Sequence, residues 1–337
     1  MVKLISSVLL CFAFFFIQAQ APGELMKSGD LKFKKGDFNG AVLDYNKAIL
    51  NNPKDEKAYN NRGIAKVNLD DFKGAKADFD KAVEINPQDE KAYCNRGNVE
   101  INLGDFAAAV TDFNKAIELN PKDETAYCNR GIAKISQSDF KGAVVDFKSA
   151  TDINPSYEKA YCNSGIAKVN LGNYNDAIID FNKAIELNPK YETAYNNRGN
   201  AKTKLGDYSG AILDFNKAIE LNPKYEDAYS NRGIAKVNLN DYKGAISDYN
   251  KAIELEPDDE DVYSNRGNAK TKLNDFNGAI ADYTKAIEIN PNYRDAYYNR
   301  GNAKMATGDK EGACLDWNKA VKLGYSKANE FIKKYCN

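Results

Sequence analysis

The chain has 337 residues with 47 basic and 48 acidic side chains, which leaves a formal net charge of -1. A balanced charge gives no reason to expect nucleic acid as a partner. The chain contains no histidine, so the commonest acid–base group and metal ligand is missing. Phosphate-loop, Cys-x-x-Cys and Gly-x-Ser-x-Gly motifs are also absent. We therefore expect a protein that is not an enzyme and needs no cofactor and no metal.

The first residues have the pattern of an export signal. Lys3 precedes an apolar run over residues 4–17, and Ala19 follows as a small residue suited to cleavage. The run is shorter than the about 20 residues that a membrane-spanning helix needs, so we expect a cleaved signal peptide at 1–19 and no integral membrane segment afterwards. Lipidation at Cys11 is an alternative, although this cysteine lies inside the run rather than at its end.

Export predicts a periplasmic or extracellular location. The chain after the signal has no Asn-x-Ser/Thr acceptor, which fits a bacterial envelope better than a eukaryotic secretory compartment.

A strict internal repeat follows the signal. Eight of the nine prolines are spaced 34 residues apart. They are Pro53, Pro87, Pro121, Pro155, Pro189, Pro223, Pro257 and Pro291. Placing each proline at position 32 divides residues 20–327 into nine units, which are 22–55, 56–89, 90–123, 124–157, 158–191, 192–225, 226–259, 260–293 and 294–327.

The repeat positions predict two packed helices in each unit. Position 8 is always glycine, from Gly29 to Gly301, and it allows close approach of two helices. Positions 20 and 27 are always alanine, and position 24 is always aromatic. A large ring among small residues is typical of helix packing.

A tight turn is predicted between the two helices. Position 15 is mostly Gly, Asn or Asp, residue types that tolerate a left-handed conformation. Position 16 is aspartate in eight units and Asn173 in the fifth, so every second helix has a side chain suited to an N-cap.

Helix pairs of 34 residues with Gly at 8, Ala at 20, an aromatic at 24, Ala at 27 and Pro at 32 resemble tetratricopeptide repeats. The resemblance implies an all-α fold, a right-handed superhelical solenoid of nine helix-turn-helix repeats with a C-terminal capping helix. Two positions depart from the family pattern: position 4 is Tyr, as in Tyr59, where the family has Trp, and position 7 is usually Arg, as in Arg62, where it has Leu.

The arginines at position 7 are expected to pair with the aspartates at position 23 on the facing helix. The predicted pairs are Arg62 with Asp78, Arg96 with Asp112, Arg130 with Asp146, Arg198 with Asp214, Arg232 with Asp248, Arg266 with Asp282, and Arg300 with Asp316. Because Ser164 interrupts the arginine series, Asp180 should lack an arginine partner.

The last residues, 327–337, resemble the extra helix that covers the final apolar face of such arrays, with Phe331 and Ile332 as its expected contacts. Cys314 and Cys336 form a possible disulfide, since export permits the bond.

The family binds partners in a concave groove lined by first helices, chiefly at positions 2, 5, 9, 12 and 13. Carrying these positions over predicts a partner-binding surface made of Lys57, Asn60, Ile64, Lys91, Asn98, Ile101, Ile132, Ile135, Lys159, Ile166, Val169 and Asn200. The resemblance implies a non-catalytic scaffold that binds protein or peptide partners. A dedicated site for one short extended or helical peptide in repeats two to five is the alternative. The oligomeric state stays open.

Each of three further sequence patterns has two possible interpretations. The residue at position 2 changes from lysine in Lys57 and Lys91 to aspartate in Asp261 and Asp295, which would orient a dipolar ligand or only form a solvated face. Cysteines at position 5 of repeats three to five could suggest a metal or redox site, but small groove fillers are the simpler interpretation. An alternating two-repeat pattern in repeats five to eight reflects either duplication or alternating pockets. The lysine and arginine set of the family's carboxylate clamp is absent.

Overall fold

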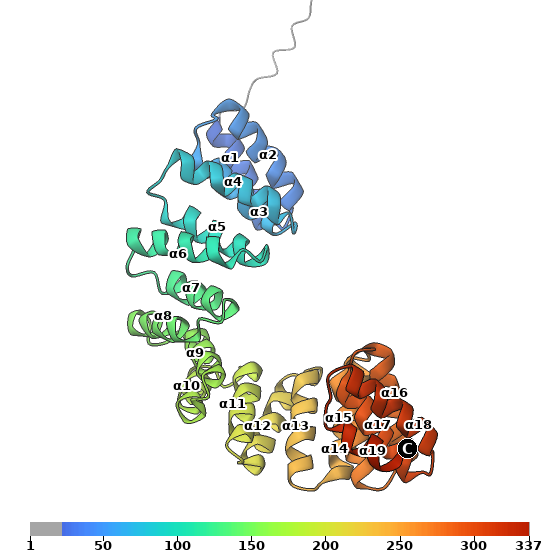
Figure 1. Ribbon diagram of the computed structural model, residues 1–337. Coiled ribbons are helices and arrows are strands. Elements are labelled where there is room, and N and C mark those ends of the chain that lie inside the picture. Colours follow the sequence, from blue (N-terminus) through green and yellow to red (C-terminus); the bar gives the residue numbers. More distant parts are fainter. Residues whose placement is uncertain (1–21, 337) are drawn as a thin grey trace, which may run out of the picture. The chain divides into compact units, whose positions relative to one another are not determined.

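The computed structural model describes residues 22–336, and the predicted signal peptide lies outside these residues. Every regular element among the described residues is an α-helix (Figure 1). The first helices of the repeats are α1 (Pro22–Lys34), α3 (Glu56–Val67), α5 (Glu90–Asn102), α7 (Glu124–Ser136), α9 (Glu158–Asn170), α11 (Glu192–Lys204), α13 (Glu226–Asn238), α15 (Glu260–Lys272) and α17 (Arg294–Ala306).

The second helices are α2 (Phe38–Asn51), α4 (Phe72–Ile85), α6 (Phe106–Leu119), α8 (Phe140–Ile153), α10 (Tyr174–Leu187), α12 (Tyr208–Leu221), α14 (Tyr242–Leu255), α16 (Phe276–Ile289) and α18 (Lys310–Lys322), and α19 (Ala328–Tyr335) follows them. The predicted fold class, an all-α array of helix pairs with a terminal extra helix, is confirmed.

The chain divides into two compact units, Met1–Gln137 and Ser138–Asn337. The N-terminal unit contains α1 to α7 and the C-terminal unit contains α8 to α19. Within each unit every helix packs on the next one along the chain. The division falls inside the fourth repeat, whose two helices belong to different units.

The glycine and aromatic columns form the core of each helix pair. A Cβ atom added at Gly63 would lie 2.7 Å from the ring of Phe79, and one at Gly199 would lie 2.6 Å from Phe215. Both rings are fully buried among alanines that are also buried. Burial of such a ring stabilises the fold by about 1.5–3 kcal/mol. The close approach of the two helices therefore depends on glycine at position 8.

The turns have the predicted left-handed residue at position 15 in all nine repeats. Four of these residues are not glycine: Asp70, Ser138, Asn240 and Asn274. The aspartates at position 16 cap the second helices as expected; the Asp71 carboxylate, for example, accepts a bond from the Gly74 amide at 2.9 Å.

The N-cap prediction was wrong for Asn173. This residue lies at the N-cap of α10, but its side chain accepts no capping bond. The third residue of α10 is Asp176, where seven of the other second helices have the glycine that receives the capping carboxylate. Asp176 brings an acidic group of its own to the positive end of the helix dipole, so part of the lost stabilisation is replaced by charge.

The predicted Arg–Asp pairs are present wherever the structure describes both partners within one unit. Arg62 donates through Nε to Asp78 at 2.9 Å, and the equivalent distance for Arg232 and Asp248 is 3.0 Å. The guanidinium of Arg62 also lies over the ring of Tyr59, at 5.3 Å from its centroid. The two departures from the family pattern, Tyr at 4 and Arg at 7, are thus one coupled feature.

A lysine at position 11 completes this network, and the sequence reasoning missed it. Lys66 Nζ lies 2.8 Å from Asp78, and Lys236 Nζ lies 2.8 Å from Asp248. In repeat five, where the arginine is absent, Lys168 Nζ lies 2.6 Å from Asp180. Asp180 therefore lacks an arginine as predicted but still has a cationic partner.

The extra helix α19 covers the apolar end of the last repeat. Phe331 lies 5.3 Å from the ring of Trp317, centroid to centroid, and Ile332 packs on the same cluster. The Sγ atoms of Cys314 and Cys336 form a disulfide that ties α18 to the residue after α19. Ring contacts and a covalent bond thus hold a short helix that could not stay folded alone.

Candidate functional site

The N-terminal unit has a groove along its first helices. Its first part is a cavity of about 270 Å³ lined by Asp30, Phe33, Lys34, Tyr45, Asn61 and Ile64. Asp30, Phe33 and Lys34 come from α1, whereas Asn61 and Ile64 come from α3. Phe33 and Ile64 give the cavity apolar walls, and the remaining side chains give it a polar rim.

A second cavity of about 120 Å³ adjoins the first at Ile64, which lines both. The other lining residues are Val67, Phe79, Asn95, Asn98, Val99 and Asn102. We call the two cavities together the N-terminal groove. It crosses the first helices of repeats one to three, α1, α3 and α5.

Hydrogen bonds fix the polar rim of the groove. Asp30 accepts bonds from the Tyr45 hydroxyl at 2.7 Å and from Asn61 Nδ2 at 3.1 Å. Burial and the nearby Asp30 carboxylate raise the pKa of Tyr45, so this hydroxyl stays protonated and donates. Asn95 Nδ2 donates to Asn60 at 2.9 Å. Bonds between repeats therefore orient the groove's amides before any partner arrives.

The structure brings some predicted residues to this groove. Ile64 and Asn98 line it directly, and Asn60 borders it through its bond to Asn95. Lys57 and Lys91 are exposed near the start of α3 and α5. Ile101, in contrast, packs against the core cluster of Phe113.

The other predicted residues lie outside the groove. Ile132 and Ile135 are half-buried on α7. In the C-terminal unit, Ile166 and Val169 pack against the core cluster around Phe181. Lys159 is exposed and Asn200 is half-buried.

Two features of the surface differ from the sequence-based prediction. Position 5 contributes less to the surface than predicted, because four of its nine side chains are buried; these are Cys128, Cys162, Asn196 and Ser264. The prediction also omitted repeat one, whose Asp30, Phe33 and Lys34 line the larger cavity. These residues occupy positions 9, 12 and 13 of repeat one, so applying the predicted groove positions to this repeat would have identified them.

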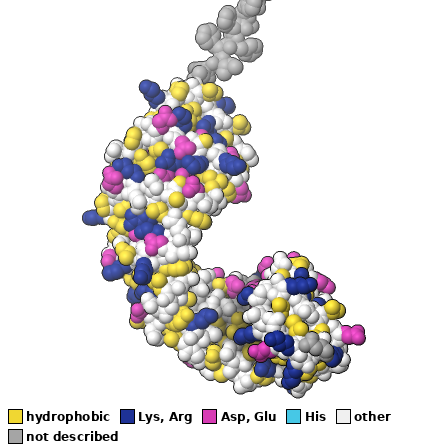
Figure 2. All heavy atoms as spheres, viewed as in Figure 1, with side chains coloured by type: hydrophobic (Ala, Val, Ile, Leu, Met, Phe, Trp, Pro, Cys, Tyr) yellow, Lys and Arg dark blue, Asp and Glu magenta, His cyan; other side chains and the backbone are white. Residues whose placement is uncertain are grey.

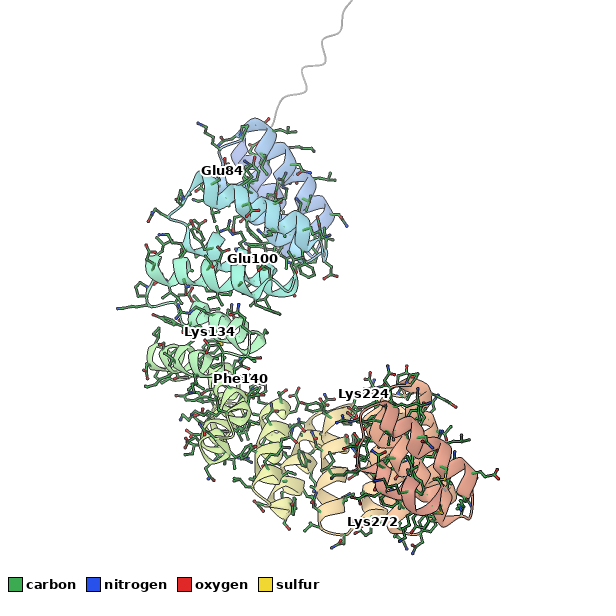
Figure 3. All side chains as sticks on the ribbon, in the orientation of Figure 1. Glu84, Glu100, Lys134, Phe140, Lys224 and Lys272 are labelled. Atoms are coloured by element: carbon green, nitrogen blue, oxygen red, sulfur yellow. A yellow bond between two sulfur atoms is a disulfide. The ribbon has the colours of Figure 1, made fainter. Side chains whose placement is uncertain are left out.

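A buried carboxylate follows Val99, a residue that lines the smaller cavity. Glu100 on α5 is only 3% exposed and stands where the other repeats have the position-11 lysine. This carboxylate, whose residue is labelled in Figure 3, lies 3.2 Å from Nζ of Lys76 on α4. Burial and the Asp112 carboxylate raise the pKa of Glu100 to about 7, against the opposing effect of Lys76 and Arg96.

The C-terminal unit has its own perturbed carboxylate. Burial, together with Asp227, Asp259 and Glu256, raises the pKa of Glu226 to about 7. Glu256 stands at position 31, where repeats one to six and repeat eight have asparagine. In repeat eight that asparagine, Asn290, donates to Glu260 at 3.0 Å, so repeat seven has lost a donor at this place.

The described residues contain no group of carboxylates and thiols that could hold a metal ion. Cys94 donates to Asp123 at 3.6 Å, and burial with this carboxylate raises the pKa of the thiol to about 12. Burial also raises the pKa of Cys162 to about 11. Both thiols stay protonated and unreactive at neutral pH. Over residues 22–336 the helices are too short and polar to cross a membrane.

Family models match most of the chain. A TPR repeat model matches residues 29–70, 165–206, 199–240, 235–273 and 267–308, and tetratricopeptide repeat models match 56–89 and 90–123. The chain belongs to the tetratricopeptide repeat family. No curated protein matches it significantly.

Solved structures of repeat proteins are similar to the chain. A tetratricopeptide repeat protein from Parabacteroides merdae is 25% identical, with a TM-score of 0.58, and the match covers 74% of this chain and 100% of that one. The APC/C hetero-tetramer Cut9–Hcn1 is 14% identical over 94% of this chain and 76% of that chain, with a TM-score of 0.61. Pseudomonas aeruginosa PilF is 17% identical over 64% and 100%, with a TM-score of 0.56. The last two show the fold alone.

Proposed function

We propose that the chain is a non-catalytic scaffold that binds protein partners on its first helices, with the N-terminal groove as the main contact. The observation that carries this proposal is the pair of adjoining cavities that share Ile64. Their volumes suit single apolar side chains and fall below the usual 300–1,000 Å³ of small-molecule sites. The fixed amides at the rim suit the backbone of a bound segment.

A dedicated site for one short peptide is the second candidate. Two cavities of side-chain size support it, because they would accept neighbouring side chains of one segment. In this form the site uses repeats one to three rather than two to five. Titration of captured partners distinguishes the two candidates: a scaffold binds several proteins at once, whereas the peptide module binds one.

Export to a bacterial envelope or to the outside of the cell belongs to the same proposal. The pattern of residues 1–19 supports it, and so does the Cys314–Cys336 disulfide, since such bonds persist mainly in oxidising compartments. Cell fractionation of the tagged chain would contradict this location if the protein stayed in the cytoplasm.

Crosslinking in cells followed by affinity capture tests the groove. Ile64→Asp places a charge in both cavities, and we expect captured partners to fall at least about tenfold. Leu43→Asp is the control, because Leu43 lies in the same unit but is 60% exposed on α2, away from the groove. Equal capture by both variants, with helical content unchanged, would show that partners bind elsewhere.

A further inference from the structure

The first helices of the two units present different charges on the same surface. Positions 2, 6, 9 and 13 follow one face of a helix, since they are separated by three or four residues. In the N-terminal unit this face has four lysines and one aspartate, which are Lys27, Lys34, Lys57, Lys91 and Asp30. In the C-terminal unit it has three of each sign, which are Lys159, Lys204, Lys272, Asp227, Asp261 and Asp295. The difference in charge between the two units is confined to this helix face. Over the surface drawn in Figure 2, basic and acidic side chains are interspersed.

The lysines beside the N-terminal groove have no acidic partner among residues 22–336. Lys34 lines the larger cavity, and Lys57 lies on the same face of α3 as Asn61 and Ile64. All are exposed, whereas the position-11 lysines are paired with buried aspartates. The one carboxylate on this face, Asp30, already accepts two hydrogen bonds. Asp30 keeps its charge and offsets one of the four lysines, so this face of the N-terminal unit has a net positive charge.

Helix stability does not account for two of these lysines. Lys57 and Lys91 are each the second residue of a first helix. A cation there is disfavoured by the positive end of the helix dipole. In the C-terminal unit the same position holds Lys159 and Thr193 in repeats five and six, and then Asp227, Asp261 and Asp295, the charge that the dipole favours. Lysine at this place in repeats two and three is better explained by something bound in front of it.

We infer that the partner segment of the N-terminal groove is an acidic peptide with bulky apolar side chains. This inference rests on the proposed function and adds the chemistry of the partner. The apolar side chains enter the two cavities at Ile64, and the carboxylates lie against Lys34, Lys57 and Lys91. Glutamates at position 1 recur in both units, so they do not alter the difference in charge between the two units. The charge complementarity raises both affinity and association rate at low salt.

Fluorescence anisotropy with three synthetic peptides tests the inference. All three carry the same phenylalanine and leucine positions, and their other residues are acidic, neutral or basic. With the purified protein at about 0.05 M salt, the acidic peptide should bind at least about tenfold more tightly than the basic one, and the difference should shrink at about 0.3 M salt.

Two charge-reversal variants provide the matched comparison. The test variant is Lys34→Glu with Lys57→Glu and Lys91→Glu, and it should lose about tenfold or more of its affinity for the acidic peptide. The control makes the same three changes in the C-terminal unit, at Lys159, Lys204 and Lys272. It should change the affinity by less than about twofold.

The outcomes separate this inference from the proposed function. If all three peptides bind equally and Ile64→Asp abolishes binding, the groove is the site but the charge preference is wrong. Equal losses in the test and control variants would also overturn the preference. If no peptide binds, or if Ile64→Asp has no effect, both the acidic partner and the groove itself are contradicted.

Discussion

The N-terminal and C-terminal units share one framework but present different surfaces. In repeat two, Lys66 lies 2.8 Å from Asp78, and in repeat seven Lys236 lies 2.8 Å from Asp248. The framework side chains thus repeat almost without change. The N-terminal unit combines adjoining cavities at its first helices with unpaired lysines. Residues that hold helices together are constrained by packing, whereas outward positions are free to differ and so distinguish the units.

The largest expected effect concerns the shared framework. Asp78→Ala leaves Arg62 and Lys66 without their buried acceptor, so we expect a loss of about 3 kcal/mol in local stability. Asp248→Ala should cost a similar amount in the C-terminal unit. Hydrogen exchange of the two helix pairs measures both. A clear difference between them would show that the framework is not equivalent in the two units.

Asp180→Ala sharpens this test. Asp180 has a lysine partner but no arginine, so fewer interactions are lost and the destabilisation should be smaller than for Asp248→Ala. An equal loss would mean that the arginine adds nothing to the network.

The C-terminal unit has a disulfide, whereas the described part of the N-terminal unit has none. Replacing Cys314 and Cys336 by serine should destabilise α19 by about 2–4 kcal/mol. Trp317 is the only tryptophan and packs on Phe331, so its fluorescence reports the loss during urea unfolding. Cys94→Ser in the other unit is the control and should leave this transition unchanged.

We expect Glu100 to make the stability of the N-terminal unit depend on pH. Its pKa is about 7 in the folded chain against an ordinary 4.5, so the folded state holds the proton more tightly. The stability that this group contributes is fully present below pH 4.5 and is lost as the pH rises through 7, about 3 kcal/mol in total. Glu100→Gln should flatten this part of the stability curve between pH 5 and pH 8, measured by urea unfolding.

A double variant provides the control for Glu100. Glu100→Lys with Lys76→Val restores the residues that repeat one has at the two positions, Lys32 and Val42. The restored lysine should pair with Asp112 and remove the pH dependence as well. If the wild-type chain and both variants have the same pH profile, Glu100 does not titrate in this range.

The smallest expected effect concerns α10. Asn173→Asp supplies the carboxylate that caps the other second helices and should raise local stability by about 0.5 kcal/mol. The nearby Asp176 limits the gain through repulsion. The matched change Asp207→Asn removes part of a working cap on α12 and should lower stability. Hydrogen exchange of α10 and α12 gives both values, and a loss at α10 would contradict the cap argument.

The sequence alone determined the framework of this protein. Gly63, Phe79 and the 34-residue spacing of prolines predict the helix pairs because each repeat faces the same packing problem. The Arg62–Asp78 pair was predictable for the same reason. The lysines at position 11 were equally periodic, so Lys66 could have been found from its register.

The tertiary structure decided which surface positions come together. Ile64 packs on the core cluster of Phe79 just as Ile166, in the same register, packs on that of Phe181. Ile64 also lines both cavities, and periodicity does not predict this. The ion pair of Lys76 and Glu100 joins positions on two different repeats, so the repeat period does not predict it. Framework contacts recur with the sequence period and can be read from it. A groove depends on the summed shape of neighbouring side chains, which only the packed chain determines.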